Sequence, residues 1–310
     1  MLRLGLCCLF QQAPIKFRST TATYLKKLDR PGQLARVSQL CLDNSNTLVT
    51  ALDEVHQLGF GSFRVMSPLF PIFTHPQVGY QLDELPHAAQ IRANLATVKL
   101  RKEQYGLRLS FHPDQFTLLS SPRPEVTAAS LQELTYQAQL AEMIGADVIN
   151  IHGGGVYGDK AAALLRLEQQ ITALPEPIRS RLTLENDDIS YTVADLLPLC
   201  TKLSIPLVYD AHHHRCNPDG LSIADATEAC VQTWRQVGRE PYFHISSPKY
   251  GWQNKPRPHA DFIDSADFPA EWLTLNATVD VEAKAKELAI LRLQQDLLLP
   301  AWKAQGEADD

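Results

Sequence analysis

Short apolar runs alternate with longer segments of helical periodicity along the whole chain. Runs rich in leucine or β-branched residues predict eight buried strands, at residues 3–8, 62–66, 107–111, 148–151, 182–184, 207–209, 242–245 and 278–281. Between several of these runs, apolar residues recur at the i, i+3, i+4 and i+7 spacing of one helix face. This alternation indicates a parallel sheet covered by helices.

The helical spacing is clearest in three segments, which are marked by Leu48, Leu52, Val55 and Leu58, by Ile91, Leu95 and Val98, and by Leu131, Leu134, Ala138 and Ala141. A glycine directly follows each segment, at Gly59, Gly106 and Gly145. Glycine is common there because the residue after a helix often adopts the left-handed conformation. The first connection, residues 10–44, is expected to be a long loop, and loops of that length are generally functional or disordered.

Eight strand and helix units in 310 residues, without a linker or a low-complexity tract, predict a single (β/α)8 TIM barrel over residues 1–310. An acidic, flexible tail is expected at about residues 303–310. A doubly wound open sheet is the alternative, but the G-x-G-x-x-G and G-x-x-x-x-G-K-[ST] phosphate loops are absent. We therefore expect the barrel, with its active site at the carboxyl ends of the strands, and no nucleotide cofactor.

Composition narrows the class of protein further. With 45% apolar residues the chain can bury a full core without disulfides. No apolar run approaches the roughly 18 residues of a membrane span. The six cysteines are irregularly spaced, without a C-x-x-C pair, which predicts free thiols in a reducing compartment. We expect a cytoplasmic monomer.

Side chains that can bind a metal stand at or near the ends of six predicted strands: His112, His152, Glu185, Asp210, His244 and Glu282. Barrel active sites are built at that end of the strands. His213 follows Asp210 by three residues, and His259 lies in the loop after the seventh strand. One such residue is more often a helix cap or a core histidine. Six of them at one barrel mouth would repel or lack partners without a divalent cation.

This nitrogen and oxygen ligand set suits Mn, Fe or Zn. Several metals in one site suit hydrolysis of a phosphodiester. A sugar isomerase or epimerase on the same barrel would also bind metal, and a DNA-damage-binding protein without catalysis is a third possibility. The loop after His112 favours a DNA substrate, because Gln115 and Phe116 stand side by side ahead of Arg123. An aromatic ring that stacks on a displaced base contributes about 1–3 kcal/mol.

The net charge of −6 by itself argues against a nucleic-acid partner. The charge is nevertheless uneven, since residues 1–36 hold seven basic residues and one acidic one. A second basic cluster, Lys249, Lys255 and Arg257, includes no acidic residue. We expect both clusters on loops at the barrel mouth and the acidic residues of 261–310 largely on the last helix and tail. The field at the mouth would then favour a phosphate backbone.

The chain resembles the UV damage endonucleases, metal-dependent (β/α)8 barrel relatives of the endonuclease IV type abasic-site nucleases. The resemblance covers nearly the whole chain and rests on Arg3-Leu-Gly-Leu-Cys-Cys8, Phe63-Arg64-Val65, Thr74-His75-Pro76, His112-Pro-Asp-Gln-Phe116, His152-Gly-Gly, Gly158-Asp-Lys160, Leu184-Glu-Asn-Asp187, Asp210-Ala-His-His213, His244-Ile-Ser-Ser and Val281-Glu-Ala-Lys-Ala-Lys-Glu287. It implies cleavage of damaged duplex DNA immediately 5′ to cyclobutane pyrimidine dimers and 6-4 photoproducts, with abasic sites as a further substrate. The product would carry a 3′-hydroxyl, and Mn would be the preferred metal.

The resemblance also implies two or three metal ions held by particular residues. His112, His152 and Glu185 would hold one ion, with His75 close by. Glu185 would bridge to a second ion, whose other ligands would be Asp210, His244 and Glu282. His213 and His259 would hold a third. Of these residues, Glu185, Asp210 and Glu282 would be the catalytic carboxylates.

Gln115 and Phe116 match the Gln-Tyr pair of the family, which implies that they probe the strand opposite the lesion while the damaged dinucleotide is flipped out. Arg123 and the cluster of Lys249, Lys255 and Arg257 are expected to contact DNA.

The chain departs from the family at three positions. Tyr242 stands two residues before His244, where relatives commonly have a lysine that can be carboxylated. A tyrosine cannot form a carbamate, so this departure bears on the third ion. Leu6 stands where relatives often have tyrosine, and Phe116 lacks the hydroxyl of its counterpart. We expect altered lesion preference rather than lost incision.

Overall fold

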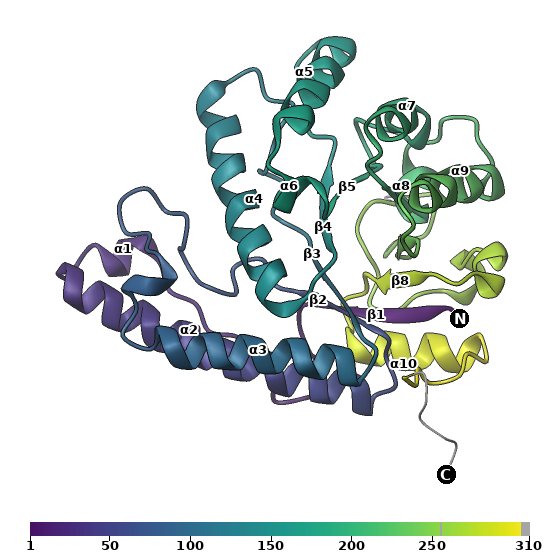
Figure 1. Cartoon of the computed structure of the whole chain (residues 1–310). Helices are drawn as coiled ribbons and strands as arrows, with labels where there is room; N and C mark the ends of the chain where they lie inside the picture. Colours follow the sequence, from purple (N-terminus) through teal and green to yellow (C-terminus); the bar gives the residue numbers. More distant parts are fainter. Residues whose placement is uncertain (255, 305–310) are drawn as a thin grey trace.

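Eight parallel strands close into a barrel in the computed structural model, which describes residues 1–254 and 256–304 (Figure 1). Each strand pairs with the next along the chain, and β8 pairs with β1. The strands are β1 (Arg3–Cys7), β2 (Ser62–Val65), β3 (Arg108–Phe111), β4 (Val148–His152), β5 (Leu182–Glu185), β6 (Leu207–Asp210), β7 (Tyr242–Ile245) and β8 (Thr278–Val281). The predicted (β/α)8 barrel is confirmed.

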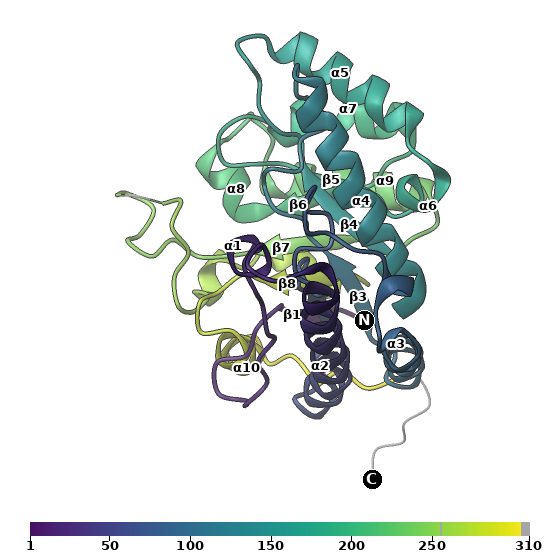
Figure 2. The ribbon, with the colours of Figure 1, turned by 90° about the vertical axis from the view of Figure 1, so that its left-hand side faces the viewer.

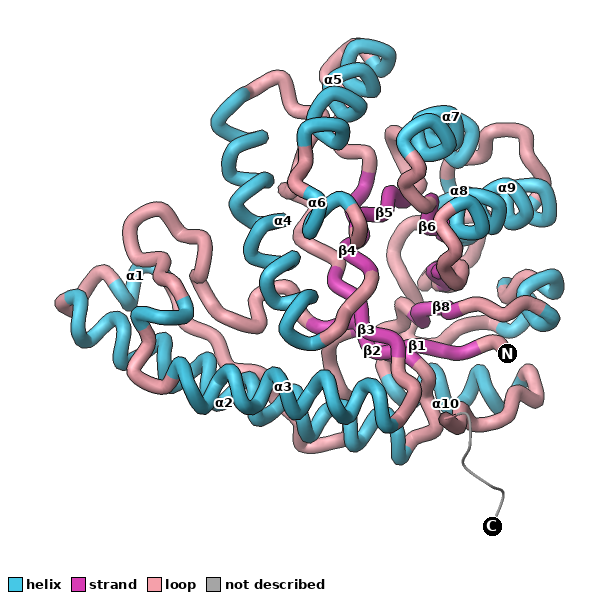
Figure 3. Tube along the Cα trace, viewed as in Figure 1, coloured by secondary structure: helices cyan, strands magenta, loops and turns pink. Residues whose placement is uncertain are grey.

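Helices lie outside the barrel and separate consecutive strands (Figure 3). They are α1 (Ala22–Leu25), α2 (Arg30–Gln57), α3 (Ala88–Gln104), α4 (Pro124–Ile144), α5 (Lys160–Ala173), α6 (Glu176–Arg179), α7 (Val193–Leu203), α8 (Ala211–Cys216), α9 (Ile223–Gln236) and α10 (Glu287–Asp296), with 3-10 turns η1 (Leu82–Glu84), η2 (Ser265–Asp267) and η3 (Ala270–Thr274). The long helices α2 and α3 lie side by side (Figures 1 and 2). The connection between β7 and β8 projects away from the barrel (Figure 2). Gly59, Gly106 and Gly145 have positive φ angles of 71°, 59° and 73°, as predicted for residues that end helices.

The expected loop over residues 10–44 is wrong, because helix α2 already begins at Arg30. The Asp29 side chain accepts a hydrogen bond from the backbone N–H of Gly32 and caps the helix, and Pro31 lies in its first turn. Val37 and Cys41 then continue the buried face of the helix toward its centre. The cap and the proline were the sequence signal for this start.

Side chains alternate along each strand between the barrel interior and the surrounding helices. The outward positions are apolar and buried, as Leu109 and Phe243 illustrate. Polar side chains occupy much of the interior, where branched apolar residues usually pack a TIM barrel, and Val148 and Val208 form a small apolar cluster with Tyr242 there. Ser110 on β3 and Tyr242 on β7 show the polar part directly, because their oxygens lie 2.7 Å apart across the barrel.

The interior network continues from Tyr242 to Asp280 and Arg64. The Tyr242 hydroxyl donates to the Asp280 carboxylate, which also accepts from Arg64 Nε at 2.8 Å. Burial raises the pKa of Tyr242 well above its ordinary value, so the hydroxyl keeps its proton and can donate. Glycine is required at position 5, because a Cβ atom there would lie 2.2 Å from Asp280 Oδ1. The interior therefore leaves no room for a side chain at position 5.

Arg3 lies at the end of the barrel opposite the mouth, since it begins β1. Its guanidinium donates to the Gly106 carbonyl at 2.9 Å, pairs with Glu240 at 2.9 Å and lies 3.9 Å from the centre of the Trp302 ring. The expectation that the basic residues of 1–36 gather at the mouth is thus wrong for Arg3. Of the expected acidic tail, residues 305–310 lie outside the described residues.

Two further expectations concern membranes and cysteines. Among the helices in the described part of the chain, none combines the length and the apolar character needed to cross a membrane. All six cysteines belong to the described residues and are free thiols, as predicted. Leu6, one of the three departures from the family, is fully buried in the apolar core.

Replacing Tyr242 with phenylalanine should destabilise the fold without changing its shape. Asp280 would lose a buried hydrogen-bond donor and Ser110 its partner, which typically costs about 1–3 kcal/mol. Urea unfolding of Tyr242→Phe measures the loss. Tyr24→Phe, at a half-exposed position on α1, is the matched control and should unfold like the wild type. Equal unfolding midpoints for the two variants would contradict the role given to the interior network.

Candidate metal centre at the barrel mouth

Six side chains that can bind a metal lie at one end of the barrel because of where their strands stop. His152, Glu185 and Asp210 are the last residues of β4, β5 and β6. His112 and Glu282 directly follow β3 and β8, and His244 is the third residue of the four in β7. Parallel strands in a closed barrel all end on the same side, so these side chains meet at its mouth.

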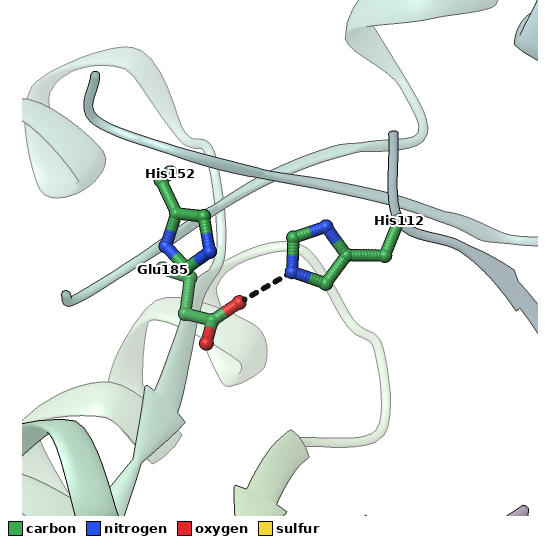
Figure 4. Close-up of side chains that lie close together, drawn as sticks. All are labelled: His112, His152 and Glu185. Atoms are coloured by element: carbon green, nitrogen blue, oxygen red, sulfur yellow. Dashed lines mark hydrogen bonds and ion pairs between the residues drawn. The ribbon is translucent and has the colours of Figure 1, made fainter. Parts of the chain in front are cut away.

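Glu185 forms a first group of ligand atoms with His112 and His152 (Figure 4). One ligand atom from each residue lies within 4.8 Å of the other two, and His112 Nε2 is 3.1 Å from Glu185 Oε2. The Asn150 amide donates to the same carboxylate oxygen, and the Thr183 hydroxyl donates to Asn150 Oδ1 at 2.9 Å. These contacts from the barrel interior orient a carboxylate that is only 1% exposed.

A second group joins the same Glu185 to Asp210 and His213. His213 Nδ1 lies 3.3 Å from Glu185 Oε1 and 3.5 Å from Asp210 Oδ2. The Asn186 side chain accepts from the backbone N–H of Asp210 and donates to its carbonyl, both at 2.9 Å, which fixes the end of β6. One buried carboxylate is therefore shared between two candidate metal sites.

The residues present fit divalent cations. His152 Nδ1 and Asp210 Oδ2 are buried and have no hydrogen-bond partner among the described residues. Such atoms are costly to leave unpaired, and native structures rarely do so. A set of imidazole nitrogens and carboxylate oxygens, without a thiolate, suits Mn, Fe or Zn.

The charges around Glu185 hold it ionised. Burial would raise the pKa of its carboxyl, but His244, His152 and hydrogen bonds from His112 and His213 outweigh that effect and hold the pKa well below its usual range. Burial lowers the pKa of His112, which favours the neutral imidazole that binds a metal. Burial also acts to lower the pKa of His213, yet Asp210 and Glu185 raise it well above the ordinary value.

Arg64 lies on β2, across the mouth from Glu185 on β5. The sequence interpretation did not include it among the residues of the site. Its Nη1 donates to Glu282 at 2.6 Å, and its Nη2 lies 2.8 Å from His244 Nε2. A guanidinium can only donate, so His244 Nε2 accepts and Nδ1 is left facing Glu185 at 3.1 Å and Glu282 at 3.5 Å. The signal was a charged residue inside an apolar run, because buried arginines are almost always paired.

Four of the predicted ligands lie outside both groups, and their roles as ligands stay predictions. His244 and Glu282 contact Arg64 as described. His259 Nδ1 lies 3.8 Å from Glu282 Oε2, and its ring centre is 6.5 Å from that of His213. His75 belongs to the connection between β2 and η1, where its Nδ1 accepts from the backbone N–H groups of Gln77 at 3.1 Å and Val78 at 3.3 Å.

The predicted DNA-contacting residues lie on loops that follow the strands. Gln115 and Phe116 are exposed beyond β3, and Asp114 Oδ1 accepts from the Phe116 backbone N–H at 3.0 Å, which shapes the turn. Arg123 is exposed at the start of α4. Lys249 and Arg257 lie on the β7–β8 connection, where Arg257 pairs with Asp188 at 3.2 Å. Lys255 lies outside the described residues.

The sequence interpretation also did not identify the exposed apolar side chains on these loops. Five of the eight connections that follow a strand carry one, 42–72% exposed: Leu9, Phe116, Tyr157, Ile189 and Tyr250. Exposed apolar groups around a polar cavity commonly mark a binding surface. Each lies within nine residues of a strand end, which is the signal that could have found them.

Most acidic residues of 261–304 lie outside the final helix, contrary to the expectation from sequence, and the acidic residues of the expected tail lie outside the described residues. Asp280 and Glu282 lie at the barrel, and Asp267 accepts hydrogen bonds from Ser247 and from Trp252 Nε1 on the β7–β8 connection. The Glu287 carboxylate is buried and accepts from backbone N–H groups of the β1–α1 connection. Several of these carboxylates therefore accept hydrogen bonds from groups within the fold.

Comparison with known proteins places the chain in a family. The sequence profile described as "UV-endonuclease UvdE" matches residues 2–303. A UV DNA damage endonuclease of Bacillus velezensis is 36% identical over 303 residues, which cover 94% of this chain and 91% of the relative. The solved structure of SacUVDE aligns over 96% of this chain and 98% of its own, with 27% identity and a TM-score of 0.83.

Endonuclease IV of Thermus thermophilus shares the barrel fold, with a TM-score of 0.61 and 15% identity over 96% of this chain and 98% of its own. The profile covers nearly all of the chain, and the Bacillus relative is matched over most of its length. The chain therefore belongs to the UvdE family of UV endonucleases, as the resemblance of its motifs implied.

Proposed function

We propose that this chain nicks double-stranded DNA immediately 5′ to cyclobutane pyrimidine dimers and 6-4 photoproducts and leaves a 3′-hydroxyl. Abasic sites are a further proposed substrate, and a cytoplasmic monomer the proposed form. The observation that carries the proposal is the Glu185 carboxylate, shared by two candidate metal sites at the mouth of a UvdE-family barrel. The names of its relatives, which are UV DNA damage endonucleases, support DNA as the substrate.

His112, His152 and Glu185 would hold one divalent cation, and Asp210 and His213 would share Glu185 around a second. Mn is the proposed metal, with Zn or Fe as alternatives, and His259 would contribute to a third site. When bound, such cations supply a strong nucleophile near neutral pH and neutralise the charge that develops on the phosphate.

The surrounding side chains hold the carboxylates in place and ionised. Burial would raise the pKa of Glu282, but Arg64 and His244 hold it below its usual range. The Asp280 carboxylate fixes the direction of the Arg64 guanidinium, which therefore presents a permanent positive charge beside Glu282. A preorganised charge of this kind needs no rearrangement as the reaction proceeds.

Lesion recognition would fall to the loops. Phe116 is 72% exposed at the tip of a turn next to Gln115, so both can enter a duplex without moving a packed segment. Flipping a nucleotide costs a few kcal/mol, and less when a lesion has already weakened stacking. Damage would then be selected in part by how easily the duplex deforms.

Replacing Glu185 with glutamine should abolish the nick, because the neutral amide cannot compensate the charge of two cations. The measurement is strand scission of a duplex with one thymine dimer, with Mn added or chelated. We expect a nick 5′ to the dimer with wild-type protein and Mn only, and at least a hundredfold less from Glu185→Gln, in line with the loss of metal-assisted stabilisation.

Glu142→Gln is the matched control, since Glu142 is exposed on helix α4 away from the mouth. Its rate should equal that of the wild type. Binding of irradiated duplex without any Mn-dependent nick would instead identify a damage-binding protein and reject the proposed incision. Bound metal, counted in the purified proteins, should fall in Glu185→Gln and remain in Glu142→Gln.

Replacing Phe116 with alanine should weaken selection of damaged over undamaged duplex by about 5- to 150-fold, the equivalent of one lost stacking contact of about 1–3 kcal/mol. Phe116→Tyr should retain the preference because the ring remains. Competition binding with undamaged duplex measures the ratio. Leu165→Ala, at an exposed apolar residue of helix α5, is the control. An unchanged ratio in Phe116→Ala would assign the ring to loop packing.

A further inference from the structure

A cavity of about 460 Å³ opens beside the candidate metal centre. It lies between the end of β1, the β7–β8 connection and the segment that follows β8. Its charged lining residues are Arg64, Arg257, Glu282, Lys284 and Lys286, together with His259. Arg64 and Glu282 also border the metal centre, so a substrate bound at the metals would lie next to this cavity.

The cavity has more positive charge than its acidic neighbours balance. Arg64 pairs with Asp280 and Glu282, and Arg257 pairs with Asp188. Over residues 1–254 and 256–304, Lys284 and Lys286 make no ion pair. The neighbouring Glu287 is already engaged, because its carboxylate accepts from the backbone N–H groups of Gln11 at 2.7 Å and Gln12 at 2.6 Å. Two lysines that line the cavity therefore have no acidic ion-pair partner among the described residues.

The backbone around these lysines is held in a specific and unfavourable shape. The N–H of Lys284 donates to the Ala260 carbonyl at 3.1 Å, and that of Ala285 donates to the Asp261 carbonyl at 3.0 Å. Lys286 has a φ of 53° and a ψ of −125°, a conformation that favours glycine. A lysine in such a conformation is strained, and strained residues cluster at functional sites.

Arg64 has guanidinium N–H groups that remain available to a ligand. A guanidinium carries five N–H groups, and the contacts to Asp280, Glu282 and His244 use three of them. Two N–H groups remain on a side chain that lines the cavity. The arrangement of one fixed guanidinium and two unpaired ammonium groups matches a phosphate, since lysine binds phosphate as a point charge and arginine through directed hydrogen bonds.

We propose that this cavity binds the backbone phosphate next to the one that is cleaved, through Lys284 and Lys286 with Arg64 facing it. The proposal rests on the proposed function, because it takes the same DNA as the substrate. A phosphate contact sets the register of the strand at the metal centre and carries no sequence information. Lys284 and Lys286 thus position the DNA, and lesion selection stays with Gln115 and Phe116.

The test measures binding of a labelled undamaged duplex in the presence of Mn, at several salt concentrations. Undamaged DNA is bound without being cut, so the result is independent of incision. In the double variant Lys284→Gln, Lys286→Gln, the loss of one phosphate contact should make the negative slope of log affinity against log salt shallower by about 1. Lys99→Gln, at an exposed lysine near the carboxyl end of helix α3, should leave the slope unchanged.

A second variant separates binding from folding. Lys286→Gly suits the left-handed backbone, so its thermal unfolding midpoint should equal or exceed that of the wild type while its affinity for the duplex falls. Wild-type salt slopes in both the glycine variant and the double variant would overturn the proposed phosphate site. A reduced slope together with no nick on dimer DNA would instead keep the phosphate site and reject the proposed incision.

Discussion

The rest of the site depends on one constraint, the burial of an ionised carboxylate at Glu185. Removing such a charge from water costs many kcal/mol unless charges and hydrogen bonds replace the lost hydration. Imidazoles from β3, β7 and the start of α8 supply part of that replacement, and the Asn150 amide supplies another. Each of these groups must arrive from a different strand, which only a closed barrel with a common mouth provides.

The same requirement explains why the barrel interior is polar. Asn150 can orient Glu185 only if it is itself oriented, and Thr183 does this from the neighbouring strand. Arg64 is held in the same manner by Asp280, and Asp280 by Tyr242. Hydrogen bonds of this kind form a connected network, in which a group left without a partner costs more than the average bond contributes. The helices pack against the outward face, where the apolar side chains are, so a polar interior does not deprive the fold of its core.

Local sequence patterns predicted much of this arrangement. They did not predict the contacts that form only when the strands close into a barrel. Strand ends such as Leu-Thr-Leu-Glu185 mark both a buried strand and the residue after which it stops, so the sequence could predict that these candidate ligand side chains meet at the barrel mouth. The pairing of Arg64 with Asp280 could not, because these residues are distant in sequence and their strands meet only through β1. His213 groups with Asp210, and not with His259, because α8 begins directly after β6 and brings His213 close to Asp210. The start of α2 was missed for a local reason, since polar residues between Asp29 and Val37 obscure its apolar face.

The net charge of −6 shows why a sum over the sequence is a poor guide to a binding surface. Glu287 is surrounded by backbone N–H groups, and Asp280 faces Arg64, so neither projects negative charge toward a ligand. Exposed lysines such as Lys249 and Lys284 have no such compensation within the described residues, and their fields extend into solvent. Buried carboxylates that bind cations become centres of positive charge, which reverses their contribution to the sum. The field that a phosphate backbone meets is therefore set by the groups left uncompensated at the mouth, and Lys284 and Lys286 are two of them.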